Sequence, residues 1–535
     1  MRLRHSRPAV LLGALVLAAS GCSAAVSGAA TGASDDAATL RLAETGEYGS
    51  LHPLEYPLGI TSKLYDGLVA VGADGVLEPG LAVAMPEADA TLTSWTVRLR
   101  EGVTFSDGSE FDAQDVVAAF DAVRDPAVGS WMAADYEMVE QVTAIDPLTV
   151  RFDLAYPYAG LPARLTLGIP ASEALGGDVV GSPLASEPVG TGPYVLAEWR
   201  KGESMTLRAR EGWWGGEPQV RTIHLAFVAD ENARAQRVRS GEVDGAQLSP
   251  RIAAQIAGSD GLELVANSSG DFRAISLPVT LPFFADPAVR VAVNLGTDRQ
   301  AMIDGILAGH GTAVATPFTP AQGDAFEPSA VFAHDPAAAA ALLDDAGWAV
   351  GPDGVRAKDG VRFAFTLMYF AEDTLRRDVA QAFASDMAPL GIDVALEGVD
   401  RRHAVTAMDE KAFVLGGGDM PYDPDAQAYR QLHSDFAVFD EDDAYSNPSG
   451  YADPDVDRLL DAARTEPDPA ARSALYRELQ TVLVANPPLV AVFALEHTYV
   501  ARGLDDWDGV EHVLEPHEHG VAWGPWFNVQ DWTRR

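Results

Sequence analysis

Cysteine is almost absent from this chain, since Cys22 is the only one among 535 residues. An intramolecular disulfide is therefore excluded, and the fold must be held by its core and its hydrogen bonds. Basic residues are also scarce: 38 Lys and Arg stand against 78 Asp and Glu, which gives a formal net charge of −40. Such a surface disfavours binding to nucleic acid and docking on anionic lipid through a basic patch.

Long hydrophobic runs are missing as well. The apolar run over residues 9–19 is too short to span a bilayer, and no later stretch approaches the eighteen or more apolar residues of a spanning helix. This short run follows arginines at positions 2, 4 and 7 and precedes Ala-Ser-Gly-Cys at residues 19–22. That order is typical of a secretory signal.

We therefore expect a signal peptide over residues 1–21 and a lipid-anchored Cys22, followed by a flexible small-residue linker over residues 22–39. The segment resembles the bacterial lipobox, except that Ala19 stands where that motif favours Leu. The alternative is a signal peptide with an incidental cysteine. The first reading places the protein outside the cytoplasm, held at the cell membrane by lipid alone.

The remainder has the composition of a globular chain, with 47% hydrophobic residues, and its length predicts more than one domain. In the first half, apolar and polar residues alternate over 95–100 and 148–154, which predicts strands. Between them, the apolar spacing over 113–123 predicts a helix capped by Asp112. The second half has three Asp-Pro helix starts, at 335–336, 453–454 and 468–469.

Apolar segments at 489–495 and 499–500 predict two further strands. Strands and helices thus alternate along the whole body. This mixture indicates an α/β architecture with two or more lobes.

Ten segments in order resemble the extracytoplasmic solute-binding proteins that serve ABC importers of dipeptides, oligopeptides and nickel (solute-binding family 5). They run from the first half of the body nearly to its C-terminal helices. A single such segment is weak, but this many in the family's order is a specific match. The segments are residues 64–69, 79–82, 99–108, 111–117, 190–194, 213–216, 241–244, 287–292, 297–299 and 341–348.

The resemblance implies a two-lobed periplasmic-binding-protein (Venus flytrap) fold, with an extra subdomain and mixed sheets flanked by helices. Two crossing strands act as the hinge, near residues 267–272 and 496–500. The implied boundaries are residues 40–63, 188–267 and 498–535 for lobe I, 64–187 for a subdomain inserted into it, and 268–497 for lobe II.

The resemblance also implies the function. Ligand that touches both lobes favours their closure, and the closed form is read by an ABC permease and its ATPase subunits. The protein is expected to be a monomer. It is also expected not to be an enzyme, because transport makes and breaks no bond in the ligand. No cofactor is implied, although a nickel chelate is a candidate ligand.

Residues 416–436 resemble the cleft-lining segment of the nickel and metal-chelate branch. In that branch a histidine is the single protein ligand of the metal and tyrosines line the chelate site, which here implies His433, Tyr422 and Tyr56. Alternatively, His433 is a helix-end histidine without a ligand. The branch's arginine clamp is missing, with Arg164 as a nearby substitute, and Gly418 replaces its stacking tryptophan.

The peptide branch places an aspartate in the same segment to pair with the α-ammonium group of the ligand, and Asp419 is the nearest equivalent. The alternative is that Asp419 caps a turn after three glycines. We favour a short peptide or peptide-like ligand, with the metal chelate as the alternative.

The C-terminal segment offers a second candidate metal cluster in His512, His517 and His519. In the family this segment returns toward the ligand, which makes Trp523 a candidate contact. If the segment is a strand, His517 and His519 share one face. The alternative is a solvated loop that contains histidines.

The sequence lacks the motifs of the common enzyme classes. The chain has no Gly-x-x-x-x-Gly-Lys-Ser/Thr loop for ATP and no Gly-x-Ser-x-Gly elbow. An exported hydrolase or a purely structural surface lipoprotein remain as distant alternatives.

Overall fold

The computed structural model describes residues 39–55, 59–418 and 422–535, and all statements below concern these residues. The signal peptide, Cys22, Tyr56 and Asp419 lie outside them, as does nearly all of the linker. The described residues form one compact unit.

The body is organised around a mixed sheet of eleven strands. Ten of them form a continuous path and β13 (Gly311–Ala313) pairs with β20 beside it. Both parallel and antiparallel neighbours occur, which confirms the mixed α/β class. The path runs β18 (Asp393–Val399), β17 (Ala364–Phe370), β19 (Ala412–Gly417), β12 (Leu262–Ser276), β20 (Leu489–Arg502), β11 (Gly245–Gln247), β1 (Thr39–Glu44), β10 (Thr222–Phe227), β9 (Ser204–Ala209) and β8 (Tyr194–Arg200).

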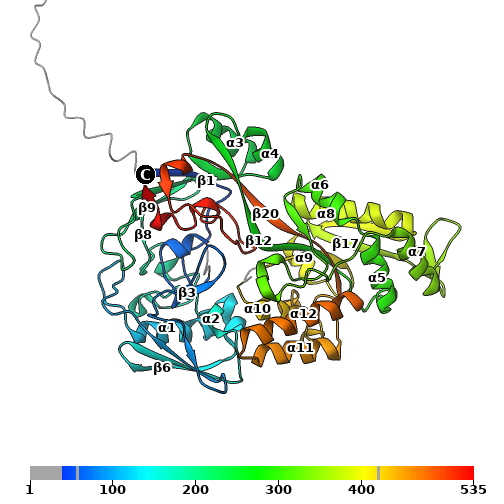
Figure 1. Cartoon of the computed structure of the whole chain (residues 1–535), viewed down its shortest axis with the longest axis horizontal. Coiled ribbons are helices and arrows are strands. Elements are labelled where there is room, and N and C mark those ends of the chain that lie inside the picture. The colour runs from blue at the N-terminus through cyan, green and yellow to red at the C-terminus, as the bar shows by residue number, and fades with distance from the viewer. Residues whose placement is uncertain (1–38, 56–58, 419–421) are drawn as a thin grey trace, which may run out of the picture. The chain divides into compact units, whose positions relative to one another are not determined.

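Two unusually long strands, β12 and β20, join the two halves of this sheet (Figure 1). They pair antiparallel from Leu262 opposite Arg502 to Ser276 opposite Leu489, and the register shifts between Ser268 and Phe272. These strands occupy the positions predicted for the crossing strands. We call the stretch around the register shift the strand crossing, meaning residues 267–273 and 494–498.

One sequence-based expectation was wrong here. Residues 489–495 and 499–500 were expected to form two strands, but they belong to the single strand β20. The polar residues Glu496, His497 and Thr498 interrupt the apolar pattern, yet they continue the ladder with β12. His497 and Thr498 are both buried. Their burial is tolerated because His497 hydrogen-bonds to Glu515 and the Thr498 hydroxyl donates to the Leu248 carbonyl.

A second sheet lies within the predicted inserted subdomain, residues 64–187, which we call the inserted segment. Its strand order is β4 (Glu87–Ala88), β5 (Ser94–Arg98), β7 (Thr149–Leu154) and β6 (Val139–Asp146). The predicted alternation is confirmed, since Trp95 and Phe152 pair across the strands and are buried. Helix α1 (Ala113–Arg124) packs against this sheet, and Asp112 caps it by accepting a hydrogen bond from the Gln114 amide at 2.6 Å.

The later helices begin where the Asp-Pro pairs predict. Helices α7 (Pro336–Asp345), α11 (Pro454–Thr465) and α12 (Pro469–Ala485) each start at the proline and have the preceding aspartate as N-cap. The proline fixes a helical φ and the carboxylate accepts an otherwise unpaired amide. The other α-helices are α2 (Leu161–Arg164), α3 (Glu231–Ser240), α4 (Pro250–Ile256), α5 (Pro287–Gly296), α6 (Arg299–Ile306), α8 (Thr374–Met387), α9 (Arg401–Val405) and α10 (Pro424–Leu432).

The buried apolar residues form separate clusters rather than one core. One cluster is drawn entirely from residues 54–179, around Phe120 and Phe152. Another surrounds Phe283 and Trp348, between β17, α5, α7 and α8. Several cores in one chain agree with a body of more than one lobe. The exact lobe boundaries given above stay a prediction.

Candidate functional site

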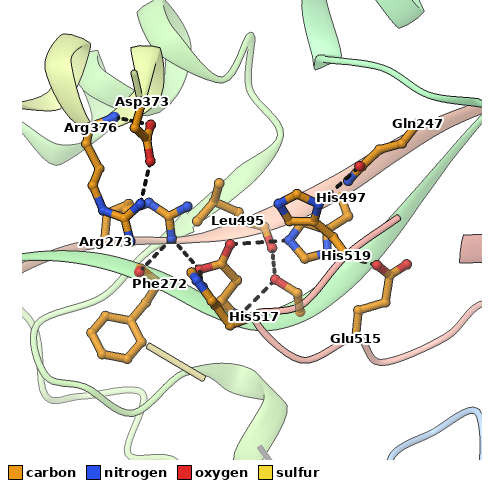
Figure 2. Close-up of polar contacts among 12 residues, drawn as sticks. Gln247, Phe272, Arg273, Asp373, Arg376, Leu495, His497, Glu515, His517 and His519 are labelled. Atoms are coloured by element: carbon orange, nitrogen blue, oxygen red, sulfur yellow. Dashed lines mark hydrogen bonds and ion pairs between the residues drawn. The ribbon is translucent and has the colours of Figure 1, made fainter. Parts of the chain in front are cut away.

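The strand crossing carries a buried cluster of charged side chains (Figure 2). Asp271 of β12 is at its centre. Its Oδ1 accepts hydrogen bonds from Arg273 and, at 2.6 Å, from Nδ1 of His517, and its Oδ2 lies 3.3 Å from Nε2 of His497. Side chains from β12, β20 and the C-terminal segment (residues 503–535) thus contact one carboxylate.

Glu515 is the second carboxylate of the cluster, and it is fully buried. It lies 2.8 Å from Nδ1 of His497 and accepts hydrogen bonds from the Tyr499 hydroxyl at 2.6 Å and the Asn267 amide at 2.7 Å. Its backbone also bonds to Ser268 and Gly270 on β12. The C-terminal segment is therefore fixed to the strand crossing.

Interactions within the cluster favour the charged forms of Asp271 and His497. Burial alone would raise the pKa of the Asp271 carboxyl, but Arg273, His517 and His497 outweigh it and hold that pKa well below the usual range. Burial alone would lower the pKa of His497, yet its hydrogen bonds to Asp271 and Glu515 raise it to about 9. His497 is thus an imidazolium at neutral pH.

The C-terminal histidines do not form the metal cluster considered from the sequence. No group of three or more His, Cys, Asp or Glu residues suited to a metal occurs in the described ranges. The segment around His517 is irregular rather than a strand, so His517 and His519 do not share a strand face. His517 bonds to Asp271, His519 lies 3.1 Å from Gln247, and His512 lies 3.3 Å from Asn267.

His519 has an unusual environment. Desolvation by the surrounding protein and the charge of His497 lower its pKa to about 3, although part of the residue is exposed. The rings of His497 and His519 meet edge to face with their centroids 5.0 Å apart.

The end of β19 approaches the same cluster. The backbone amide of His517 donates to the Gly418 carbonyl at 2.9 Å, which joins the C-terminal segment to the end of β19. Arg376 of α8 and Arg273 converge on Gly416: a Cβ there would lie 2.6 Å from Nη2 of Arg376 and 3.2 Å from Nη1 of Arg273. Gly416 thus leaves the space that these guanidinium groups occupy, and a Cβ there would move the end of the Arg376 side chain.

Two of the residues expected from the sequence lie close to Glu515. Burial and the charges of Glu515 and Glu518 raise the pKa of the Tyr422 hydroxyl, so this hydroxyl faces the C-terminal segment. Trp523 is buried and stacks on Phe527 with ring centroids 5.1 Å apart. The Tyr422 hydroxyl and the Trp523 indole N–H are buried and have no hydrogen-bond partner in the described part of the chain.

His433 lies elsewhere, at the end of α10. Its ring stacks on Tyr429 at 4.5 Å, its Nδ1 accepts the Asp435 amide, and its Nε2 lies 3.5 Å from Asp461. Nε2 is buried without a hydrogen bond to any described residue. His433 contacts none of the residues at the strand crossing in these hydrogen bonds, so its role as a metal ligand stays a prediction.

Arg164 belongs to a contact between the inserted segment and the later helices. It pairs with Asp135 at 3.2 Å and is close enough to Asp423 to lower the pKa of that carboxyl, together with Arg472. Nearby, the Ala159 amide donates to the Arg464 carbonyl at 2.9 Å. This contact joins the predicted inserted subdomain to predicted lobe II.

A separate pocket is lined by His52 of predicted lobe I and by Asp121, Asp125 and Asp178 of the predicted inserted subdomain, among others. Burial lowers the pKa of His52 to about 4, so its imidazole is neutral at neutral pH. The pocket shares no residue with the strand crossing.

Sequence reasoning located the crossing strands but not their charged residues. Asp271, Arg273 and His497 were missed, as were Arg376 and Glu515. The available signal was the pair Asp271 and Arg273 on either side of Phe272 in a predicted crossing strand, since unpaired charges are rarely buried. Glu515 gave no signal among 78 acidic residues.

Two halves of a sheet that share a pair of long strands, with a polar cluster where those strands cross, define a two-lobed binding protein. The chain matches the family described as bacterial extracellular solute-binding proteins, family 5 Middle, over residues 76–437, and it belongs to that family. It is therefore an extracytoplasmic substrate-binding protein of an ABC importer. Proteins of this family bind solutes and are not enzymes.

Three relatives illustrate the match. Protein XP55 of Streptomyces lividans is 39% identical over 511 residues, covering 95% of this chain and 93% of the relative. The glutathione-binding protein GsiB of Salmonella paratyphi A is 29% identical over 445 residues, covering 81% and 83%. The crystal structure of NikA from Brucella suis in complex with Fe(III)-EDTA has a TM-score of 0.79 at 26% identity, covering 93% of this chain and all of that one. Within the described ranges, no helix is both long and apolar enough to cross a membrane.

Proposed function

We propose that this protein binds a short peptide or peptide-like ligand between its lobes and delivers it to the permease. The observation that carries the proposal is a set of buried donors without partners around the strand crossing: the Tyr422 hydroxyl, the Trp523 indole N–H and Nε of Arg376. A buried donor without an acceptor costs about 1–3 kcal/mol. A ligand rich in carbonyl and carboxylate oxygens offers the acceptors that these donors lack.

The mechanism follows from where these donors come from. Arg376 belongs to predicted lobe II, whereas Trp523 belongs to the C-terminal segment of predicted lobe I. A ligand that binds both groups binds the closed form better than the open one, and only this difference shifts the equilibrium. A shift from 1:99 to 99:1 needs about 5.5 kcal/mol of differential binding. A few charge-assisted hydrogen bonds supply that much.

A thermal-shift panel tests the proposal, with di- to hexapeptides and glutathione as probes. A ligand at a hundredfold excess over its Kd stabilises the folded state by about 2.7 kcal/mol, so a binding peptide raises Tm by about 2–3 °C. Glutathione belongs in the panel because a relative is named as a glutathione-binding protein. If no peptide raises Tm, the peptide assignment is wrong.

A metal chelate is the second candidate ligand. It is favoured by the buried Nε2 of His433, which has no hydrogen bond to a described residue, and by the likeness to a structure in complex with Fe(III)-EDTA. The test compares the Tm response of the wild type and His433→Ala to nickel with histidine. A wild-type response that disappears in the variant, with any peptide response intact, supports coordination by His433. An unchanged nickel response excludes it.

We further propose that Cys22 carries a lipid anchor that holds a monomeric receptor at the outer face of the membrane, where it meets the permease and its ATPase subunits. The small-residue sequence before Cys22 supports this. In cells, Cys22→Ser should release the protein from the membrane fraction, whereas a membrane-bound variant contradicts the anchor.

A further inference from the structure

Arg273 and Arg376 place two guanidinium groups side by side at the strand crossing (Figure 2). Arg273 lies in β12, and Arg376 is the third residue of α8. Burial and the neighbouring charge of Arg273 lower the pKa of Arg376. Each guanidinium has an aspartate beside it, Asp271 for Arg273 and Asp373 for Arg376, yet the two cations still lie next to each other.

The hydrogen bonds of both groups to described residues use only part of each guanidinium. Nη1 of Arg273 donates to Asp271 and to the Phe272 carbonyl, and Nη1 of Arg376 donates to Asp373. A guanidinium has five N–H donors. Nε of Arg273 and Nε of Arg376 are both buried and have no acceptor in the described part of the chain. Donor capacity is therefore left over on both groups.

The two arginines lie where predicted lobe II contacts the C-terminal segment. Gly416 leaves room for both guanidinium groups, and Cε1 of His517 would lie 3.0 Å from a Cβ at the same position. His517 comes from the C-terminal segment, whereas Arg376 and Gly416 come from predicted lobe II. A group held here touches elements of both lobes at once.

We propose that Arg376 and Arg273 bind a carboxylate of the transported ligand, so that the protein selects ligands with a free carboxylate over their neutral forms. The guanidinium fork matches the two oxygens of a carboxylate, which gives both charge and geometric selectivity. The inference deepens the proposed function and rests on it. It assigns the recognition of the acid group to these two residues rather than to Arg164, whose charged partners, Asp135 and Asp423, lie outside the strand crossing.

The test uses matched pairs of probes that differ only in charge: a tripeptide and its C-terminal amide, glutathione and its dimethyl ester, and nickel with histidine or with histidinamide. Isothermal titration calorimetry on the purified wild type measures Kd for each. In any pair that binds, the neutral member should bind about tenfold to a hundredfold more weakly, the loss expected for one charge-assisted hydrogen-bonded contact.

Three variants assign the effect. Arg376→Gln should bind both members of a pair almost equally. Arg377→Gln is the matched control, because Arg377 is the next residue on α8 and pairs with Asp378 instead. Gly416→Ala keeps every charge but displaces Arg376, so it should also lose the preference for the acid. The Tm of each ligand-free variant shows whether it is folded.

The outcomes separate the two proposals. Equal binding of acid and neutral forms by the wild type, or a preference that survives in both Arg376→Gln and Gly416→Ala, overturns the carboxylate subsite and leaves the proposed function standing. If no peptide or glutathione binds, the peptide function is overturned, and the nickel pair then decides the subsite. If none of the three pairs binds, both proposals are overturned.

Discussion

The imidazole of His497 lies 2.8 Å from the carboxylate of Glu515, and the contact joins a strand shared by both halves of the main sheet to the C-terminal segment. On its other side, the same ring lies 3.3 Å from Asp271. One imidazolium between two buried carboxylates thus holds three segments together. A buried charge is tolerated when it is paired in this way, but it makes stability depend on each member.

The first prediction concerns pH. The pKa of His497 is about 9 in the folded protein against 6.5 for an ordinary histidine, so folding favours the protonated ring. The resulting stabilisation, about 3 kcal/mol, is complete below pH 6.5 and is lost as the pH rises through 9. His497→Gln cannot titrate. The difference in unfolding free energy between wild type and variant should therefore shrink as the pH rises from 6 to 9.5.

Urea unfolding at a series of pH values measures this difference. Titratable groups that do not interact with His497 contribute equally to both proteins and cancel in the comparison. A difference that stays constant from pH 6 to 9.5 would contradict an imidazolium at position 497.

The second prediction concerns Glu515. Glu515→Gln removes the charge that faces His497 and places amide hydrogens among donors from Asn267, Tyr499 and Gly524. Breaking a buried ion pair by changing one partner costs about 3–5 kcal/mol. We expect a loss of that order in urea unfolding. Glu511→Gln, at an exposed position of the same segment, is the control and should change stability by less than about 0.5 kcal/mol. Similar losses in the two variants would contradict the role given to Glu515.

Whether a feature could be predicted from the sequence depends on how far apart in the sequence its interacting residues lie. The helix starts at Asp335, Asp453 and Asp468 depend on a cap and a proline that are adjacent in the chain. The alternation around Trp95 depends only on the period of a strand. Both signals are local, and the structure confirms both.

The polar cluster depends instead on residues that are far apart in the sequence. Asp271 and His517 are separated by 246 positions, and no local pattern in either segment indicates the other. The family resemblance placed the crossing strands but could not supply these partners, because none of the segments that carry it contains Asp271, His497 or His517. His517 and His519 would share a face only if their segment were a strand. The segment is irregular instead, and His517 contacts Asp271 while His519 contacts Gln247.

The last prediction concerns the contact between the inserted segment and the later helices. Gly160 lies against α10, and a Cβ there would be 3.2 Å from Oδ2 of Asp423 and 2.9 Å from the Tyr158 hydroxyl. The adjacent Ala159 amide bonds to Arg464 across the same contact. Gly160→Val should therefore keep predicted lobe II from approaching the inserted subdomain.

If ligand is held by closure of this contact, Gly160→Val should weaken the binding of a peptide identified in the panel by at least tenfold, which corresponds to about 1.4 kcal/mol. Gly176→Val is the matched control: a Cβ at Gly176, in the same inserted segment, meets nothing within 4 Å. Calorimetry gives the two affinities, and small-angle scattering with saturating peptide should show a larger radius of gyration for Gly160→Val alone. Binding is linked to closure only if the two variants differ, because both add the same side chain to the same segment. Equal affinities for Gly160→Val and Gly176→Val would mean that the Ala159–Arg464 contact forms whether or not ligand is bound.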